Sequence, residues 1–202
     1  MKKIFTTLFI VFGFYGLSFA QQKGNVEFGV GVGGGYSLIY QGNDYSDAKA
    51  AFNGEAFADF YFSGQWSLKI KAMYDQKGWG NGFLLNNDQS VITGVDYRAT
   101  YITIPVMANW HFGRTKNWYL NFGPYAGFLT SAKETDDNID VKSAFNTVDA
   151  GLALGIGVKI PTEKRQFFFV EFDGQSGVTN IFKDSGQSVQ NLRESIDVGF
   201  SF

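Results

Sequence analysis

The sequence predicts an all-β protein, folded as an eight-stranded antiparallel up-and-down β-barrel. From Val26 onward, apolar residues alternate with polar or small residues, and turn-forming segments interrupt this alternation at regular intervals. The composition favours the same class, because 25 Gly and 22 Phe accompany only 3 Pro, and no obvious helical runs follow the first residues.

Eight segments carry the strand pattern, and connections of two sizes alternate between them. The segments are 26–40, 51–62, 66–79, 96–112, 118–132, 145–160, 167–182 and 194–202. The short connections are 63–65, 113–117 and 161–166, and the long ones are 41–50, 80–95, 133–144 and 183–193. Because a meander puts alternate connections at opposite ends, all the short turns should lie at one end. This pattern is typical of a transmembrane β-barrel with short periplasmic turns and long extracellular loops.

The first residues predict export from the cytoplasm. Two lysines precede the apolar run IFTTLFIVFGFYGLSF, and the small residues Ser18 and Ala20 occupy the positions that a signal peptidase reads. A membrane anchor is disfavoured, because this run is shorter than the roughly 20 residues that a spanning helix needs. We therefore expect a cleaved signal peptide at 1–20 and one barrel domain at 21–202.

Charge and cysteine content exclude several kinds of protein. The chain has 17 Lys+Arg against 19 Asp+Glu, and this near balance argues against a nucleic-acid partner. The chain contains no cysteine, so the fold depends neither on disulfides nor on thiolate metal sites.

Alternation alone does not say which face of the barrel points outward, since a soluble lipocalin-like barrel turns its apolar face inward. Glycine decides the question. In 145–160 the glycines share the polar parity, and Gly29, Gly31 and Gly33 do so in the first strand. Glycines weaken a water-facing wall but make room for bulky neighbours inside a narrow bore. The polar parity is therefore expected inside and the apolar parity against lipid.

The inward parity carries charged residues that form the predicted barrel-interior polar network. These residues are Glu55, Asp59, Lys69, Lys71, Asp75, Asp149, Lys159, Glu171, Asp173 and Asp197. Opposite charges in a narrow bore must pair, because an isolated buried charge is costly. We interpret them as a structural plug of salt bridges and hydrogen bonds; the alternative is a polar conduit or proton path. No catalytic residue, metal or cofactor is predicted.

Three tryptophans predict a membrane interface. Trp66, Trp110 and Trp118 lie beside the short turns and share the apolar parity. An interfacial aromatic girdle needs this placement, because an indole keeps its ring in lipid and its N–H near water.

Isolated polar features outside the network are weak indications of chemistry. His111, the only histidine, has no evident serine or carboxylate partner nearby in sequence, so we expect a polar residue at the periplasmic rim. The acidic loop 133–140 lacks the spacing of a calcium loop and is expected to be solvated. The short turns carry Arg114, Lys116, Lys164 and Arg165 against Glu163, which gives the periplasmic rim a basic tilt.

The last segment, ESIDVGFSF, predicts the closing strand of the barrel. It would pair with the first strand, so that no backbone edge is left in lipid. Phe200 and Phe202 fall on the apolar parity. The terminal aromatic residue also resembles the C-terminal signal that the barrel assembly machinery recognises.

Several segments together resemble the small outer-membrane β-barrel domains of Bacteroidota, labelled porin-family or PorT-like. They are YITIPVMANWHF (101–112), WYLNFGPYAGFLTSAKE (118–134), DAGLALGIGVKI (149–160), GVTNIFK (177–183) and the aromatic C-terminus. The resemblance implies an eight-stranded barrel in the outer membrane with both termini periplasmic. It supplies no common catalytic residues.

These observations predict a non-enzymatic outer-membrane barrel that acts as a structural or interaction scaffold, through its extracellular loops or its periplasmic rim. Outer-membrane lipid and the assembly machinery are expected partners, and envelope or secretion proteins are further candidates. A narrow transport pore, a secretion-associated barrel and a soluble lipocalin-like carrier are the alternatives.

Overall fold

The computed structural model describes residues 24–85, 91–162, 166–183 and 186–202. The predicted signal peptide at 1–20 lies outside these residues. Within them, no helix has the length and apolar character needed to cross a membrane.

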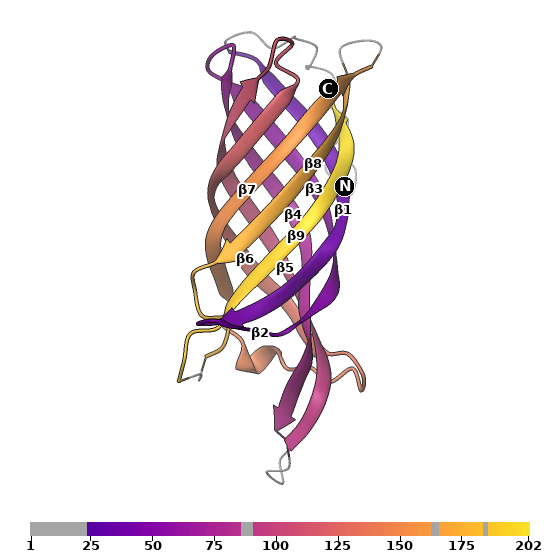
Figure 1. Ribbon diagram of the computed structural model, residues 1–202, viewed down its shortest axis with the longest axis vertical. Helices are drawn as coiled ribbons and strands as arrows, with labels where there is room; N and C mark the ends of the chain where they lie inside the picture. The colour runs from indigo at the N-terminus through magenta and orange to yellow at the C-terminus, as the bar shows by residue number, and fades with distance from the viewer. Residues whose placement is uncertain (1–23, 86–90, 163–165, 184–185) are drawn as a thin grey trace, which may run out of the picture.

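Nine strands and one short 3-10 helix make up the described chain (Figure 1). They are β1 (Val26–Gln41), β2 (Asp44–Tyr45), β3 (Asp47–Tyr61), β4 (Trp66–Leu85), β5 (Val91–Phe112), β6 (Trp118–Glu134), η1 (Lys142–Ala144), β7 (Val148–Pro161), β8 (Phe167–Gly177) and β9 (Gln190–Ser201).

The strands form a single sheet that closes on itself. Their order is β2-β1-β3-β4-β5-β6-β7-β8-β9, and β1 also pairs with β9. Every pairing is antiparallel. Because β2 has only 2 residues and pairs with the end of β1, the wall consists of the other eight strands. The predicted eight-stranded antiparallel barrel is confirmed.

The two ends of the barrel differ as the connection lengths predict. The short turns and Phe202 lie at the upper end in Figure 1, here named the short-turn end. The longer connections and the hairpin of β4 and β5 lie at the lower end, named the long-loop end.

The last strand is paired along both edges. Its partners are β8 on one side and β1 on the other, in a register that runs from Gly29 opposite Ser201 to Tyr40 opposite Gln190. Phe28 and Phe202 then exchange two backbone hydrogen bonds of 3.0 and 2.8 Å. The β1–β9 seam therefore leaves no open sheet edge there, as a strand in lipid requires.

One long connection is more ordered than the sequence predicts. The described parts of the segment 80–95, predicted as a loop, continue β4 as far as Leu85 and β5 from Val91, and they project beyond the barrel (Figure 1). Glycines and a register shift near Trp79 hide the alternation there, while the pairs Leu84–Ile92 and Leu85–Val91 maintain the hairpin.

Other strand boundaries also differ from the prediction. β7 begins at Val148 and β8 ends at Gly177, because the residues before and after them fold over the barrel end, where Phe145 and Phe182 form an isolated bridge. β9 begins at Gln190, earlier than predicted, because its first residues pair with the far end of β1.

The apolar parity faces outward. Leu152 and Leu154 expose 63% and 57% of their surface, whereas Ala153 between them exposes 2%. The same contrast separates Ile196 from the buried Asp197. A soluble carrier needs the opposite arrangement, so the lipocalin-like alternative is wrong.

Candidate functional site

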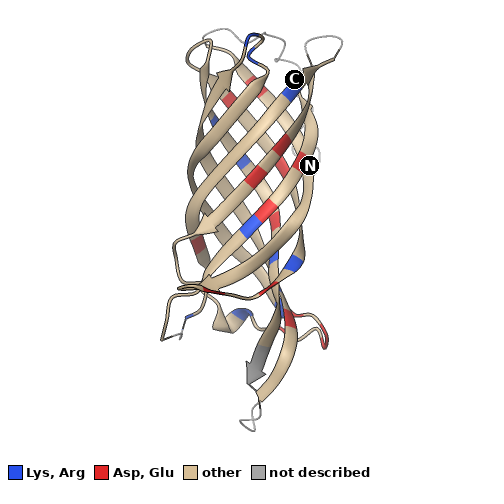
Figure 2. Ribbon diagram, viewed as in Figure 1, with Lys and Arg blue, Asp and Glu red and all other residues tan. Residues whose placement is uncertain are grey.

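Most of the buried charged side chains belong to the strands of the barrel wall and point into its bore. Figure 2 marks the charged residues along these strands. All ten residues of the predicted barrel-interior polar network lie in the bore, with 6% or less of their surface exposed. They are Glu55, Asp59, Lys69, Lys71, Asp75, Asp149, Lys159, Glu171, Asp173 and Asp197.

Three buried charged residues of the bore were missed by the sequence reasoning, namely Glu27, Lys77 and Arg193. Parity could have found the first two, since Glu27 shares the glycine parity of β1 and Lys77 continues the inward row of β4. Arg193 was assigned to a loop, because the start of β9 was placed too late.

Lys71 is the centre of the network. Its Nζ lies 2.6 Å from Glu171 Oε1, 2.8 Å from Glu55 Oε2 and 3.5 Å from Asp173 Oδ2. Lys69 adds a contact of 3.4 Å to Glu171 Oε2. These groups come from β3, β4 and β8, so the ion pairs join strands on opposite walls of the barrel.

Arg193 forms a second group, adjacent to the first. Its guanidinium pairs with Asp173, and its Nε lies 3.1 Å from Asp75 Oδ1. Its Nη1 also donates a hydrogen bond of 2.6 Å to Ser195, whose hydroxyl donates one of 2.7 Å to Asp197. Asp173 thus links the two groups.

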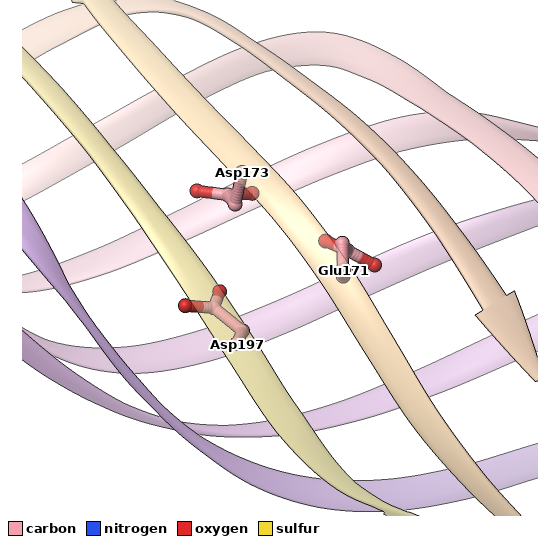
Figure 3. A group of neighbouring side chains, drawn as sticks. All are labelled: Glu171, Asp173 and Asp197. Atoms are coloured by element: carbon pink, nitrogen blue, oxygen red, sulfur yellow. The ribbon is translucent and has the colours of Figure 1, made fainter.

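Three carboxylates in these groups approach one another closely. Glu171 and Asp173 project from β8, and Asp197 projects from the neighbouring β9 (Figure 3). One oxygen from each lies within 4.8 Å of the other two, which is compatible with cation ligands in principle. Lys71 and Arg193, however, already supply positive charge to this cluster, so the carboxylates have a structural explanation within the chain itself.

Toward the long-loop end, Lys77 and Asp149 form the next ion pair. Lys77 Nζ lies 2.9 Å from Asp149 Oδ2. The same oxygen accepts hydrogen bonds from Asn191 at 3.0 Å and from the Tyr125 hydroxyl at 3.3 Å. A buried carboxylate with three donors is far less costly than an isolated one.

Toward the short-turn end, Lys159 pairs with Glu27. The distance from Nζ to Oε1 is 2.6 Å, and the Tyr61 hydroxyl joins the two, accepting from Lys159 at 2.9 Å and donating to Glu27 at 3.1 Å. Asp59 lies 3.9 Å from Lys159 and accepts a hydrogen bond of 2.8 Å from Asn109.

His111 lies inside the bore and exposes only 1% of its surface, which corrects its expected place as a simple rim residue. It also has a serine and a carboxylate nearby in space, although neither is evident close to it in the sequence. Its Nε2 lies 3.2 Å from Ser67 Oγ, 3.2 Å from Asn109 Nδ2 and 3.7 Å from Asp59 Oδ2. Because serine and carboxylate meet the same ring nitrogen, they do not form the relay of a hydrolase, in which each takes a different nitrogen.

Glycines provide the space that the large side chains occupy. A Cβ at Gly33 would lie 1.7 Å from Asp197 Oδ1, and one at Gly155 would lie 2.4 Å from Asn121 Oδ1. The glycine row on the inner face thus has the packing role that the narrow bore requires.

An aromatic cap, defined here as the apolar cluster at the long-loop end, joins the connections into one unit. Trp79 of β4 stacks on Tyr97 of β5 at 5.0 Å, and packs against Phe145 and Phe182 at 5.9 Å each. Phe145 precedes β7 and Phe182 follows β8. Three separate connections are therefore fixed relative to one another.

The loop 133–140 is a small turn rather than a fully solvated acidic segment. Glu134 exposes only 1% of its surface, and its carboxylate accepts backbone hydrogen bonds from Asp136 at 2.6 Å and Asp137 at 2.9 Å. These two hydrogen bonds give the Glu134 carboxylate a structural role that needs no calcium ion.

The predicted girdle residues lie together on the outer wall at the short-turn end. Trp66, Trp110 and Trp118 expose 36%, 37% and 49% of their surfaces. Trp66 and Trp110 are cross-strand partners and stack at 6.2 Å.

The residues of the predicted assembly signal lie on the β1–β9 seam. Phe200 faces outward with 53% exposure and packs against Phe168. Phe202 pairs with Phe28 through the backbone. Of the basic short-turn residues, Arg114 is exposed, whereas Lys164 and Arg165 lie outside the described residues.

Residues 19–183 match the protein family described as "Outer membrane protein beta-barrel domain". No curated protein matches the sequence.

Several solved structures resemble the barrel at low sequence identity. Neisserial surface protein A is 12% identical, with 86% of this chain and 95% of that chain covered and a TM-score of 0.51. Ail, the attachment invasion locus protein of Yersinia pestis, solved with the heparin analogue sucrose octasulfate, is 14% identical, with 90% and 100% covered and a TM-score of 0.46. Outer membrane protein OprG from Pseudomonas aeruginosa is 12% identical, with 91% and 98% covered and a TM-score of 0.47. At these identities, the similarity to Neisserial surface protein A supports the fold alone.

Proposed function

We propose a binding role for this chain, which belongs to the family of outer membrane protein β-barrel domains. In this proposal the protein is a closed, non-enzymatic barrel, and its long-loop end is the surface that contacts binding partners. The aromatic cap carries this proposal. It holds residues of the β4–β5 hairpin, the β6–β7 connection and the β8–β9 connection in one arrangement. Loops held by a rigid scaffold are where binding residues usually lie.

Exposed apolar side chains near this end support a binding role. Tyr45 exposes 65% of its surface, Val178 66% and Ile139 40%. In the family, long loops face the outside of the cell and short turns face the periplasm. Partners would therefore be met at the cell surface.

The filled bore argues against an open pore. Lys71 and Arg193 each expose 1% of their surface at mid-bore, and both are held in ion pairs. An eight-stranded barrel is only just wide enough for its own side chains. His111 itself exposes only 1% of its surface, and this burial supports a non-enzymatic role.

Photocrosslinking in intact cells tests the proposal. A photoreactive amino acid at Tyr45 or Val178 should capture a protein partner, whereas one at Leu152, which is as exposed but lies on the lipid-facing wall, should not. Phe145→Ala, which removes an aromatic ring from the cap, should abolish the capture while the barrel remains heat-modifiable. Capture from the wall position alone would contradict the proposal.

Two alternatives have direct tests of their own. Large stable conductance steps from the purified protein in planar bilayers would favour the narrow transport pore. The PorT-like resemblance raises a secretion-associated role with partners at the periplasmic rim. Loss of protein secretion on deletion of the gene would favour that role.

A further inference from the structure

The outer wall has a polar pocket near the long-loop end. It lies on β5, β6 and the turn that follows β6, and has a volume of about 120 Å³. Its lining consists of Arg98, Thr100, Ser131, Lys133, Thr135 and Asn138. Every one of these side chains carries a hydrogen-bond donor, and none is acidic.

A β-bulge brings the two cations together on the outward face. The register between β5 and β6 shifts after Thr100, where Thr130 has no partner. Beyond this bulge Thr100 stands opposite Ser131, and Arg98 stands opposite Lys133. Directly opposite residues have Cβ atoms about 5 Å apart, and like charges at this spacing destabilise a sheet. An anion between them would remove that repulsion.

Neither cation forms a salt bridge with a carboxylate of the described residues. Among the described residues, Arg98 has no hydrogen bond or ion pair, and Lys133 Nζ donates a hydrogen bond of 3.0 Å to Asn138 Oδ1. The next outward carboxylate on β5, Asp96, is paired with Lys49 at 3.1 Å. Asp136 and Asp137 lie in the exposed turn nearby, and Asp140 stands opposite Lys133 in an isolated bridge, where its carboxylate accepts a hydrogen bond of 2.9 Å from the backbone N–H of Lys142. Within the described chain, no salt bridge joins any of the three to Arg98 or Lys133.

The pocket lies just beyond the apolar belt of the barrel. On β5 this belt runs outward-facing from Trp110 to Ile102, which spans about 21 Å along the barrel axis at a rise of about 3.4 Å per residue and a tilt of about 40°. Ile102 and its partner Phe128 expose 41% and 45% of their surfaces. By the same geometry, Arg98 lies about 10 Å further toward the long-loop end. This is the level of the lipid headgroups.

We propose that this pocket binds the phosphate group of an anionic membrane lipid in the leaflet at the long-loop end. Arg98 and Lys133 supply the charge, because guanidinium and ammonium groups recognise phosphate through charged hydrogen bonds. The hydroxyls of Thr100 and Ser131 supply further donors. Ile102 and Phe128, which lie next to the pocket on its short-turn side, supply an apolar surface for the acyl chains. The site is separate from the loop surface proposed for protein partners and does not depend on it.

Lipid retention tests the proposal. The full-length protein is reconstituted in nanodiscs of phosphatidylcholine with a minor fraction of phosphatidic acid, extracted into mild detergent, and examined by native mass spectrometry. The wild-type protein should retain phosphatidic acid preferentially. Arg98→Gln combined with Lys133→Gln should bind it roughly 30-fold more weakly, since each cation near an anionic lipid contributes about a fivefold factor.

The matched control changes the same charges at the opposite end. Arg114→Gln combined with Lys116→Gln removes an arginine and a lysine from a short turn and should leave retention unchanged. Arg98→Lys keeps the positive charge and should therefore keep part of the binding of phosphatidic acid. If the double variant does not assemble, the single variant Arg98→Gln takes its place, because Arg98 is exposed and its substitution should leave an assembled protein.

A titration with inorganic phosphate separates a lipid from a soluble anion. Without acyl chains, phosphate should bind far more weakly than phosphatidic acid. Equal retention of phosphatidic acid by the wild-type protein and the pocket variants would overturn the proposal. Equal affinity for inorganic phosphate would overturn the assignment to a lipid.

Discussion

Gly33 of β1 stands directly opposite Asp197 of β9, and the Asp197 carboxylate occupies the space where a side chain of residue 33 would begin. The distance from a Cβ at Gly33 to Asp197 Oδ1 would be only 1.7 Å. Asp197 is itself held there by Ser195 and by a hydrogen bond of 3.0 Å from Asn53. Closure of the sheet and placement of the interior charges therefore depend on the same contact.

Gly33→Ala should destabilise the barrel by about 1–3 kcal/mol, because the added methyl group displaces a hydrogen-bonded carboxylate in a packed interior. The measurement is the urea concentration at which the folded, faster-migrating band is lost. Gly34→Ala is the control, since a Cβ there meets nothing within 4 Å and points outward. Equal shifts for the two variants would contradict the packing explanation.

Lys71→Met should lower stability by about 3–5 kcal/mol, because it leaves buried carboxylates without their shared cation. Adding Glu171→Gln to this variant should restore part of the loss, since one of the uncompensated charges is then removed. Urea titration of the single and double variants in the same detergent checks both expectations. A wild-type midpoint for Lys71→Met would show that the ion pairs contribute little.

The predicted aromatic girdle can be located by fluorescence quenching. In a variant that retains Trp118 as its only tryptophan, lipids brominated near the headgroup should quench the emission more strongly than lipids brominated near the chain ends. In a variant that retains Trp79 as its only tryptophan, neither brominated lipid should quench the emission strongly, because this ring exposes 3% of its surface and lies in the aromatic cap. Stronger quenching of Trp118 by the deep label would place the ring in the membrane interior.

Phe202→Asp should lower the amount of assembled, heat-modifiable protein in cells if the terminal aromatic residue is an assembly signal. Refolding of the purified variant into detergent separates this role from stability, because no assembly machinery is present. We expect refolding close to that of the wild type, since the backbone pairing with Phe28 does not require the ring. Equal losses in cells and in detergent would count against the signal.

The sequence predicts the walls of this barrel better than its long-loop end. Period-two alternation identifies the inward residues of β7 and β8 directly, because neighbouring side chains of a strand point to opposite faces. The same rule fails for 80–95, where glycines and a register shift obscure a hairpin that continues in space. Phe145 and Phe182 look like strand residues in sequence, yet they pack in the aromatic cap.

The sequence pattern also did not predict which side chains of different strands contact one another. Ser67 and Asp59 lie near His111 only because β3, β4 and β5 are adjacent in the sheet. Likewise, Arg193 belongs to the interior because β1 is long enough to pair with the first residues of β9. Alternation assigns a face to a side chain, but register between strands decides which partner it meets.

The ion pairs of the bore also constrain the order of folding. Lys71 belongs to β4 and Glu171 to β8, 100 residues later, so this ion pair cannot form until the sheet has curled through most of its strands, although Glu55 of the adjacent β3 can already pair with Lys71. A hairpin that entered the bilayer alone would carry unpaired charges into hydrocarbon, which is costly. Productive insertion is thus favoured when the strands cross the membrane together, with curling of the sheet and neutralisation of its charges as one cooperative event.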